Sequence, residues 1–209
     1  FRTYNEGIAF RYEIPYQSGF EKVVIDKELT EFAFPKNTSV WESHGHEGKY
    51  YKVYPFEVKT DCELPLTCQT PQGVYGAIME AGNNHYPRAY LEAPYRKENI
   101  LRISLRGEAK GERGMVTAWR VISLADEPGK LMEQNYLLYN LNESCKLADT
   151  SWIKPGTVMR ETTISTPECL KMIDYCASMG ISYMILDWGW YGLASSHKSD
   201  PSIVNVTNP

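Results

Sequence analysis

The segment "ILDWGWYG", residues 185–192, combines side chains that are suited to binding a sugar. Its apolar run ends in Asp187, which can accept hydrogen bonds from hydroxyl groups, and Trp188, Trp190 and Tyr191 can offer apolar faces to a sugar ring. At the carboxyl end of a barrel strand such groups face an active site, whereas the opposite strand ends serve stability. We therefore assign substrate binding to Asp187, Trp188 and Trp190. The competing interpretation is that the aromatic rings only pack beneath the next loop.

Three other charged positions bear on chemistry. Arg160 lies in the preceding predicted strand and is either the partner that a carboxylate at Asp187 needs or a surface charge. Glu80, in "GAIMEAGNNHYP", directly follows an apolar stretch, and for an arbitrary glutamate a solvated strand end is the simplest interpretation. The motif "HGHE", residues 44–47, has the composition of a metal site, but it falls between predicted strands, and we interpret it as a loop.

From Gly7 to about Asn142 the apolar residues recur with a period of two. The segments "IAFRYEI", "LRISLRG", "MVTAWRVISL" and "NYLLYNLN" each predict a strand, and Gly-, Asp- and Pro-rich turns separate them. In "IAFRYEI", Ile8 and Phe10 are expected on the buried face of the strand and Ala9 on the solvent-facing side. No helix of convincing length interrupts this pattern. The fold class is therefore mainly β, with an antiparallel β-sandwich over residues 1–143.

After a predicted linker over 144–156 the periodicity changes. "TVMRETT" predicts a short strand, and a helix follows with Thr166 as its cap and Gly180 at its end. "ISYMILDW" is nearly all apolar, as a parallel strand covered on both faces should be. Residues 157–209 thus predict one βαβ unit, the beginning of a sheet or barrel that two strands cannot complete.

Composition excludes several classes of protein. The 209 residues carry a formal net charge of −4 with acids and bases mixed, so no basic face for nucleic acid is expected. No apolar run approaches the ~20 residues of a membrane span. The five cysteines are odd in number and form no CxxC, so neither a zinc ribbon nor a disulfide scaffold is indicated. Cys62 and Cys68 could close a small loop in an oxidising compartment; otherwise the cysteines are expected to act as small buried hydrophobes.

The sequence resembles glycoside hydrolase family 97 in consecutive blocks. They are "FRTYNEGIAFRYEIP", "IMEAGNNHYPRAYLEA", "TAWRVISL", "NLNESCKLADTSWIKPG" and "YCASMGISYMILDWGWYG". The resemblance implies a mutarotase-like β-super-sandwich followed by a (β/α)8 barrel, and an internal piece covering the later sandwich, the linker and the first two barrel strands. It implies a calcium-dependent α-glucosidase or α-galactosidase that acts on oligosaccharides and is periplasmic or secreted.

The resemblance also implies roles for particular residues. The family glutamate that matches Glu80 helps to bind Ca²⁺, an ion that takes six to eight oxygen ligands, so the others must come from the remainder of the parent polypeptide. The family's catalytic acids lie on later barrel strands, and no catalytic residue is expected within 1–209. Some members carry aromatic residues where this chain has "VMRETT", which leaves the substrate subclass open. The alternative is a non-catalytic carbohydrate-binding or structural β-sandwich, although the βαβ unit favours the enzyme.

Overall fold

The computed structural model describes residues 1–19, 21–193, 196, 198–200 and 202. The chain divides into two compact units, Phe1–Cys145 and Lys146–Pro209. The division lies inside the segment that the sequence predicts to be a linker. No helix in the described part of the chain combines the length and the apolar character needed to cross a membrane.

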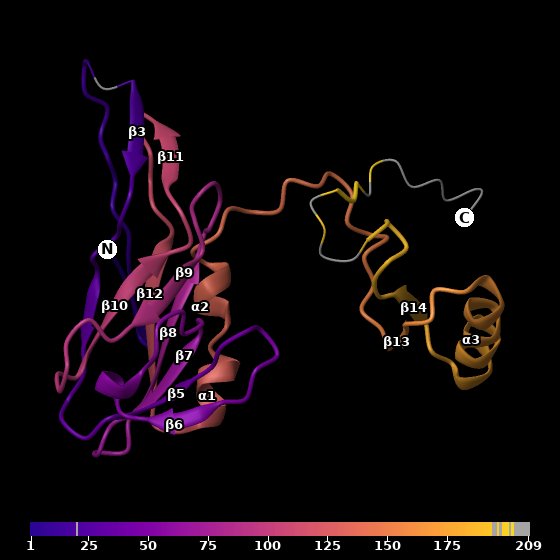
Figure 1. The fold of residues 1–209 in the computed structure, drawn as a ribbon, viewed down its shortest axis with the longest axis horizontal. Helices are drawn as coiled ribbons and strands as arrows, with labels where there is room; N and C mark the ends of the chain where they lie inside the picture. The colour runs from indigo at the N-terminus through magenta and orange to yellow at the C-terminus, as the bar shows by residue number, and fades with distance from the viewer. Residues whose placement is uncertain (20, 194–195, 197, 201, 203–209) are drawn as a thin grey trace. The chain divides into compact units, whose positions relative to one another are not determined.

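The first unit contains a seven-stranded and a three-stranded antiparallel sheet (Figure 1). In spatial order the larger sheet contains β1 (Arg2–Tyr4), β2 (Gly7–Phe10), β12 (Trp119–Ala125), β8 (Tyr75–Ala81), β7 (Leu66–Gln69), β5 (Ser39–Glu42) and β6 (Tyr51–Val53). The smaller sheet contains β4 (Glu31–Ala33), β10 (Ile100–Leu105) and β9 (Ala89–Glu92). The sequence prediction of a mainly β, antiparallel fold is confirmed.

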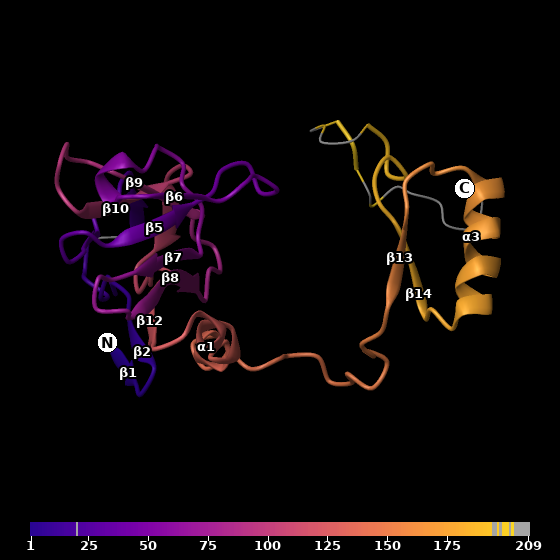
Figure 2. The same ribbon diagram turned by 90° about the horizontal axis from the view of Figure 1, so that it is seen from below.

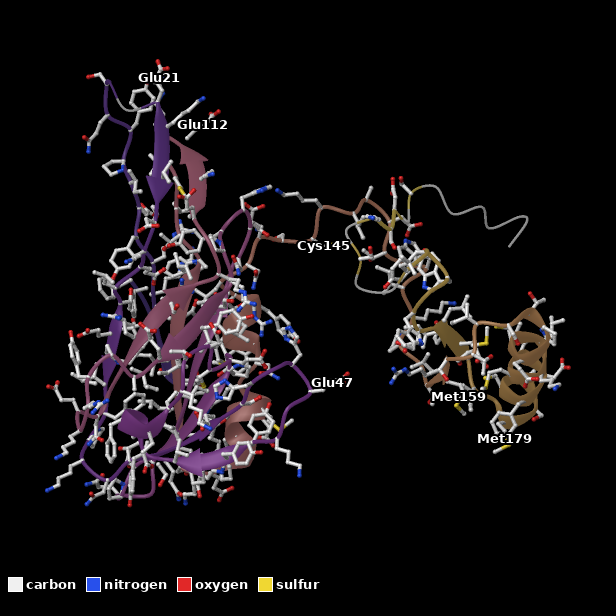
Figure 3. All side chains as sticks on the ribbon, in the orientation of Figure 1. Glu21, Glu47, Glu112, Cys145, Met159 and Met179 are labelled. Atoms are coloured by element: carbon white, nitrogen blue, oxygen red, sulfur yellow. The ribbon has the colours of Figure 1, made fainter. Side chains whose placement is uncertain are left out.

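A 3-10 helix and a two-stranded ladder also belong to this unit. A 3-10 helix, η1, spans Pro55–Glu57. The strands β3 (Lys22–Ile25) and β11 (Ala109–Glu112) form a separate two-stranded ladder that projects beyond the sheets in Figure 1. Figure 3 shows Glu21 and Glu112 at the far end of this ladder.

A hydrophobic core lies between the two sheets. Strands of the larger sheet contribute Val40, Leu66 and Ile78 to this core, and the smaller sheet contributes Leu91 and further apolar side chains of its strands. The core also contains Cys62 and Cys68, which are free thiols, so the disulfide that the sequence allowed is not formed. Burial raises the pKa of both thiols to about 11. These cysteines therefore act as small apolar side chains.

The opposite face of the larger sheet is covered by α1 (Pro128–Glu133) and α2 (Tyr136–Tyr139). The prediction of a strand over "NYLLYNLN" is therefore wrong. Leu137 and Leu141, four residues apart, share one side of a helical turn and are 0% and 5% exposed in a second core with Val121. The same helices explain why Ala9, expected on a wet face, has no exposed surface.

The second unit contains the predicted βαβ arrangement. The strands β13 (Val158–Glu161) and β14 (Tyr183–Leu186) pair in parallel, and α3 (Thr166–Met179) connects them and lies beside them in Figure 2. The helix cap is Ser165 rather than Thr166, because its hydroxyl accepts the Glu168 backbone N–H at 3.4 Å. Gly180 ends the helix with a φ of 67°, which glycine adopts without strain.

The strand β14 lacks the double cover that its apolar sequence predicts. Tyr183, Ile185 and Leu186 are 42%, 50% and 36% exposed. Among the described residues, α3 is the one helix that packs against this strand pair. The apolar pattern of β14 is therefore not matched by burial among the described residues.

We expect Leu91→Ala to destabilise the sandwich by about 2–5 kcal/mol, because the substitution leaves a cavity where a side chain had no exposed surface. Leu29→Ala is the control, since Leu29 is 65% exposed and its truncation should change stability by about 0.5 kcal/mol or less. Chemical denaturation of both variants measures the difference. Equal losses would contradict the position of the core.

Candidate functional site

Glu80 lies at the end of β8 and pairs across the sheet with Arg120 of β12. It shares a sheet face with Ile78, two residues earlier, so both charged side chains lie on the side of the first core. The Arg120 side chain has no exposed surface, and its Nη1 donates to Glu80 Oε2 at 2.8 Å. A guanidinium buried to this extent needs acceptors for its donors.

Glu28, in the loop between β3 and β4, supplies two further acceptors. Its Oε1 accepts Arg120 Nε at 2.8 Å and its Oε2 accepts Nη2 at 2.6 Å, a bidentate pair. The same carboxylate accepts the Thr30 hydroxyl at 2.8 Å and the Tyr86 hydroxyl at 3.0 Å. Burial alone would raise the pKa of Glu28, but Arg120, Thr30 and Tyr86 outweigh burial and hold its pKa below the ordinary value.

The charges in this network do not cancel. Arg120 is positive and pairs with both Glu28 and Glu80, so with both carboxylates ionised the three groups carry a net charge of about −1. Glu80 keeps a side-chain exposure of 16%, and among the described residues its Oε1 accepts one long hydrogen bond, from the Asn83 amide at 3.4 Å. That oxygen is the atom of the network that is best placed to bind an added cation or donor.

The donor set of Glu80 fits Ca²⁺ as one ligand among several. A carboxylate oxygen is the hard ligand that this ion prefers, but six to eight such oxygens are needed. Among the described residues no three His, Cys, Asp or Glu side chains are grouped closely enough to hold a metal ion. Glu80 is therefore the one oxygen ligand for calcium that we assign among the described residues.

The other predicted site residues belong to the second unit. Asp187 follows β14, and its Oδ2 accepts Arg160 Nη2 at 2.6 Å, so the sequence suggestion of this partner matches the structure. The Asp187 side chain is 28% exposed, which leaves surface for a ligand hydroxyl. Trp188 and Trp190 are 55% and 42% exposed, and the ring of Trp190 meets Tyr191 edge-on at 5.3 Å. Neither tryptophan is buried under a described loop.

Three charged residues were not predicted from the sequence, two that contact each other beside Glu80 and one at the strand end next to Asp187. Arg120 and Glu28 were not singled out, although a lone arginine within the apolar "TAWRVISL" is a signal of a buried pair. Glu161, at the carboxyl end of β13, is only 4% exposed. Hydrogen bonds from the Thr163 hydroxyl and backbone lower the pKa of Glu161, so this carboxylate is held ionised beside the strand end.

The "HGHE" motif lies in a loop between β5 and β6, as the sequence predicts, and Figure 3 shows Glu47 at its tip. His44 Nε2 lies 3.2 Å from Glu42, and His46 Nδ1 lies 2.9 Å from Glu63. The two histidines thus contact different buried glutamates. This arrangement fixes a loop and gathers no metal ligands among the described residues.

The described chain thus combines an antiparallel sandwich with a parallel strand pair that is followed by an acid and aromatic rings. Residues 1–144 match the family model described as "Glycosyl-hydrolase 97 N-terminal". That match covers more than half of the sequence, and the chain belongs to glycoside hydrolase family 97.

Two curated relatives support this placement. A retaining α-galactosidase of Bacteroides thetaiotaomicron is 26% identical over 91% of this chain and 36% of its own length. A probable retaining α-galactosidase of Streptomyces bingchenggensis is also 26% identical, over 100% of this chain and 32% of its own length. The chain thus spans about a third of the length of these relatives.

Solved structures show the same architecture. A family 97 enzyme from Pseudoalteromonas sp. strain K8, in complex with acarbose, matches with a TM-score of 0.77 and 25% identity over 96% of this chain and 33% of that one. The same enzyme with an E480Q substitution, in complex with panose, also gives a TM-score of 0.77. A β-arabinopyranosidase matches at 0.67 and 17% identity, which shows the fold alone.

The lowered pKa of Glu28 predicts a pH-dependent contribution to stability. At neutral pH, Glu28→Gln should cost about 3–5 kcal/mol, because it breaks a buried ion pair. The contribution is fully present above the ordinary value of 4.5 and is lost as the pH falls through the lowered pKa, so the difference from wild type should shrink in acid. Urea unfolding between pH 7 and pH 3 measures it, with the half-exposed Glu108→Gln as the control. A difference that is constant with pH would contradict the assignment.

Proposed function

We propose that this chain is part of a longer enzyme that hydrolyses α-galactosidic or α-glucosidic bonds in oligosaccharides with the help of calcium. The family match of residues 1–144 carries the proposal. The relatives named retaining α-galactosidases and the neighbours solved with acarbose and panose support the substrate class. A non-catalytic sandwich module is the second candidate, but the β13–α3–β14 unit beyond the sandwich favours the enzyme. The same family membership supports a periplasmic or secreted location.

In this proposal the chain contributes binding rather than bond cleavage. Glycoside hydrolysis uses two carboxyl groups, one as acid and one as nucleophile or base. We place neither within 1–209 and expect both on later strands of a (β/α)8 barrel that begins with β13 and β14. Asp187 would accept hydrogen bonds from substrate hydroxyls, with Arg160 fixing the orientation of its carboxylate. Trp188 and Trp190 would supply apolar platforms for the sugar rings.

Glu80 is proposed as the ligand that the sandwich contributes to calcium. Its Oε1 would bind the ion while Oε2 stays with Arg120. Bound calcium would supply a positive charge next to the Glu80 carboxylate. The remaining oxygen ligands would come from the rest of the parent polypeptide, since the described residues contain no group of three or more His, Cys, Asp or Glu side chains that could hold a metal ion.

The enzyme assignment is tested with the full-length parent and nitrophenyl α-galactoside and α-glucoside. Wild type should hydrolyse at least one of them, and Asp187→Ala should lower kcat/KM by a factor of about 10 to 150, the value of one hydroxyl–carboxylate contact. Asp174→Ala, which removes an exposed aspartate from α3, should leave the kinetics unchanged. Sugar binding without turnover of either substrate would favour the module, and unchanged kinetics in Asp187→Ala would assign that residue a structural role.

Calcium binding is tested by Glu80→Gln in the full-length parent. Removal of one charged ligand should weaken affinity by about tenfold or more. At saturating calcium this reduces the calcium-dependent stabilisation by about 1.4 kcal/mol per tenfold. Calorimetry after chelation and readdition of calcium measures both. Glu92→Gln is a matched control, because Glu92 is 24% exposed and pairs with Arg102 at 2.7 Å. Wild-type affinity in Glu80→Gln would remove the residue from the calcium site.

A further inference from the structure

We infer that Glu28 is a positioning residue for Glu80 that acts through Arg120. By holding and neutralising the guanidinium, Glu28 leaves the Glu80 carboxylate negatively charged and oriented to bind a cation through Oε1. The inference rests on the proposed calcium role of Glu80. It assigns Glu28 an influence on an ion that it does not touch.

The orientation follows from the geometry of the guanidinium. Two of its nitrogens, Nε and Nη2, are fixed by the two oxygens of Glu28, at 2.8 and 2.6 Å. Because the group is planar, this bidentate pair also fixes the direction in which Nη1 points. Nη1 donates to Glu80 Oε2 at 2.8 Å. This hydrogen bond restrains the rotation of the Glu80 carboxylate. The other oxygen, Oε1, is then left for a ligand other than Arg120.

Glu28 itself is held from two more directions. The hydroxyls of Thr30 and Tyr86 donate to its two oxygens, one to each. Tyr12 in turn lies 3.0 Å from the Thr30 hydroxyl. Tyr12 and Tyr86 come from segments distant from Glu28 in the sequence, so Glu28 is a fixed point from which Arg120 and then Glu80 take their positions.

The charge of Glu28 affects Glu80 separately from the orientation of its carboxylate. Arg120 has no exposed surface and Glu28 only 4%, so water screens this pair weakly. With Glu28 ionised, the arginine charge is compensated and Glu80 retains its own negative charge. With Glu28 neutral, Arg120 would pair with Glu80 alone and cancel the charge that attracts calcium.

A purely structural role for Glu28 makes a different prediction. A buried ion pair can serve packing alone, and replacing it by well-packed apolar residues is often neutral for stability. In that case a substitution at Glu28 would change the melting temperature and leave the calcium affinity of the folded protein as it is. Calcium affinity is therefore the measurement that separates the two roles.

The experiment compares Glu28→Gln with Glu28→Asp in the full-length parent, with calcium affinity measured by calorimetry on the decalcified protein. Partners one step removed from a metal typically change affinity by 10- to 100-fold, so Glu28→Gln should weaken calcium binding by about that factor. Glu28→Asp keeps the charge and should lose less. The control is Glu63→Gln, another buried glutamate, which pairs with Arg88 instead of Arg120.

Each outcome decides the inference. Unchanged calcium affinity in Glu28→Gln, alongside weakened binding in Glu80→Gln, would overturn it and leave the proposed calcium site standing. Equal losses in the Gln and Asp variants would also overturn it. Unchanged affinity in Glu80→Gln would instead overturn the calcium proposal on which it rests.

If the Glu28 variants do not fold, a crystal structure of the calcium-loaded wild-type parent decides the question. The expected result keeps Arg120 Nη1 on Glu80 Oε2, with Oε1 of Glu80 on the ion. Both oxygens of Glu80 on calcium, with Arg120 turned away, would overturn the inference.

Discussion

The burial of one guanidinium group constrains the whole sandwich. Removing an ion from water costs several kcal/mol, so Arg120 is tolerable only where acceptors meet its donors. Those acceptors come from β8 and from the loop before β4, which must therefore converge on β12. A register slip of one residue would turn Arg120 onto the opposite sheet face, among the apolar side chains beneath α1 and α2. The ion network thus fixes strand register as well as the position of Glu80.

Local patterns in the sequence predicted most of the elements that contain the site. The β2, β10 and β12 segments follow a period of two, and α3 follows a helical period with Gly180 at its end. The helix α2 was missed because "YLLY" has an apolar character that fits a strand or a buried helix equally. Burial of Ala9 was missed for a different reason, because strand alternation does not show that a sheet is covered on both faces.

The site itself was predictable only where its parts are close in sequence or share a strand end. Arg160 lies in β13 and Asp187 directly follows the neighbouring β14, so their pairing could be suggested from the pattern. The contact of Glu28 with Arg120 spans 92 positions, and that of Arg120 with Glu80 spans 40. No periodicity connects such distant segments. The arginine within the apolar "TAWRVISL" indicates that a buried partner exists. The identity of that partner is seen only in the folded structure.

The exposed apolar residues of β13, α3 and β14 have a practical consequence for handling the protein. Val158, Ile173 and Ile185 are 52%, 47% and 50% exposed, and among the described residues β13 and β14 form a sheet of two strands, so each is an edge strand. Strand edges of this kind recruit strands from other molecules, and apolar patches add to the attraction. When residues 1–209 are produced alone, this unit would promote self-association and precipitation at high concentration, whereas the sandwich encloses two hydrophobic cores of its own.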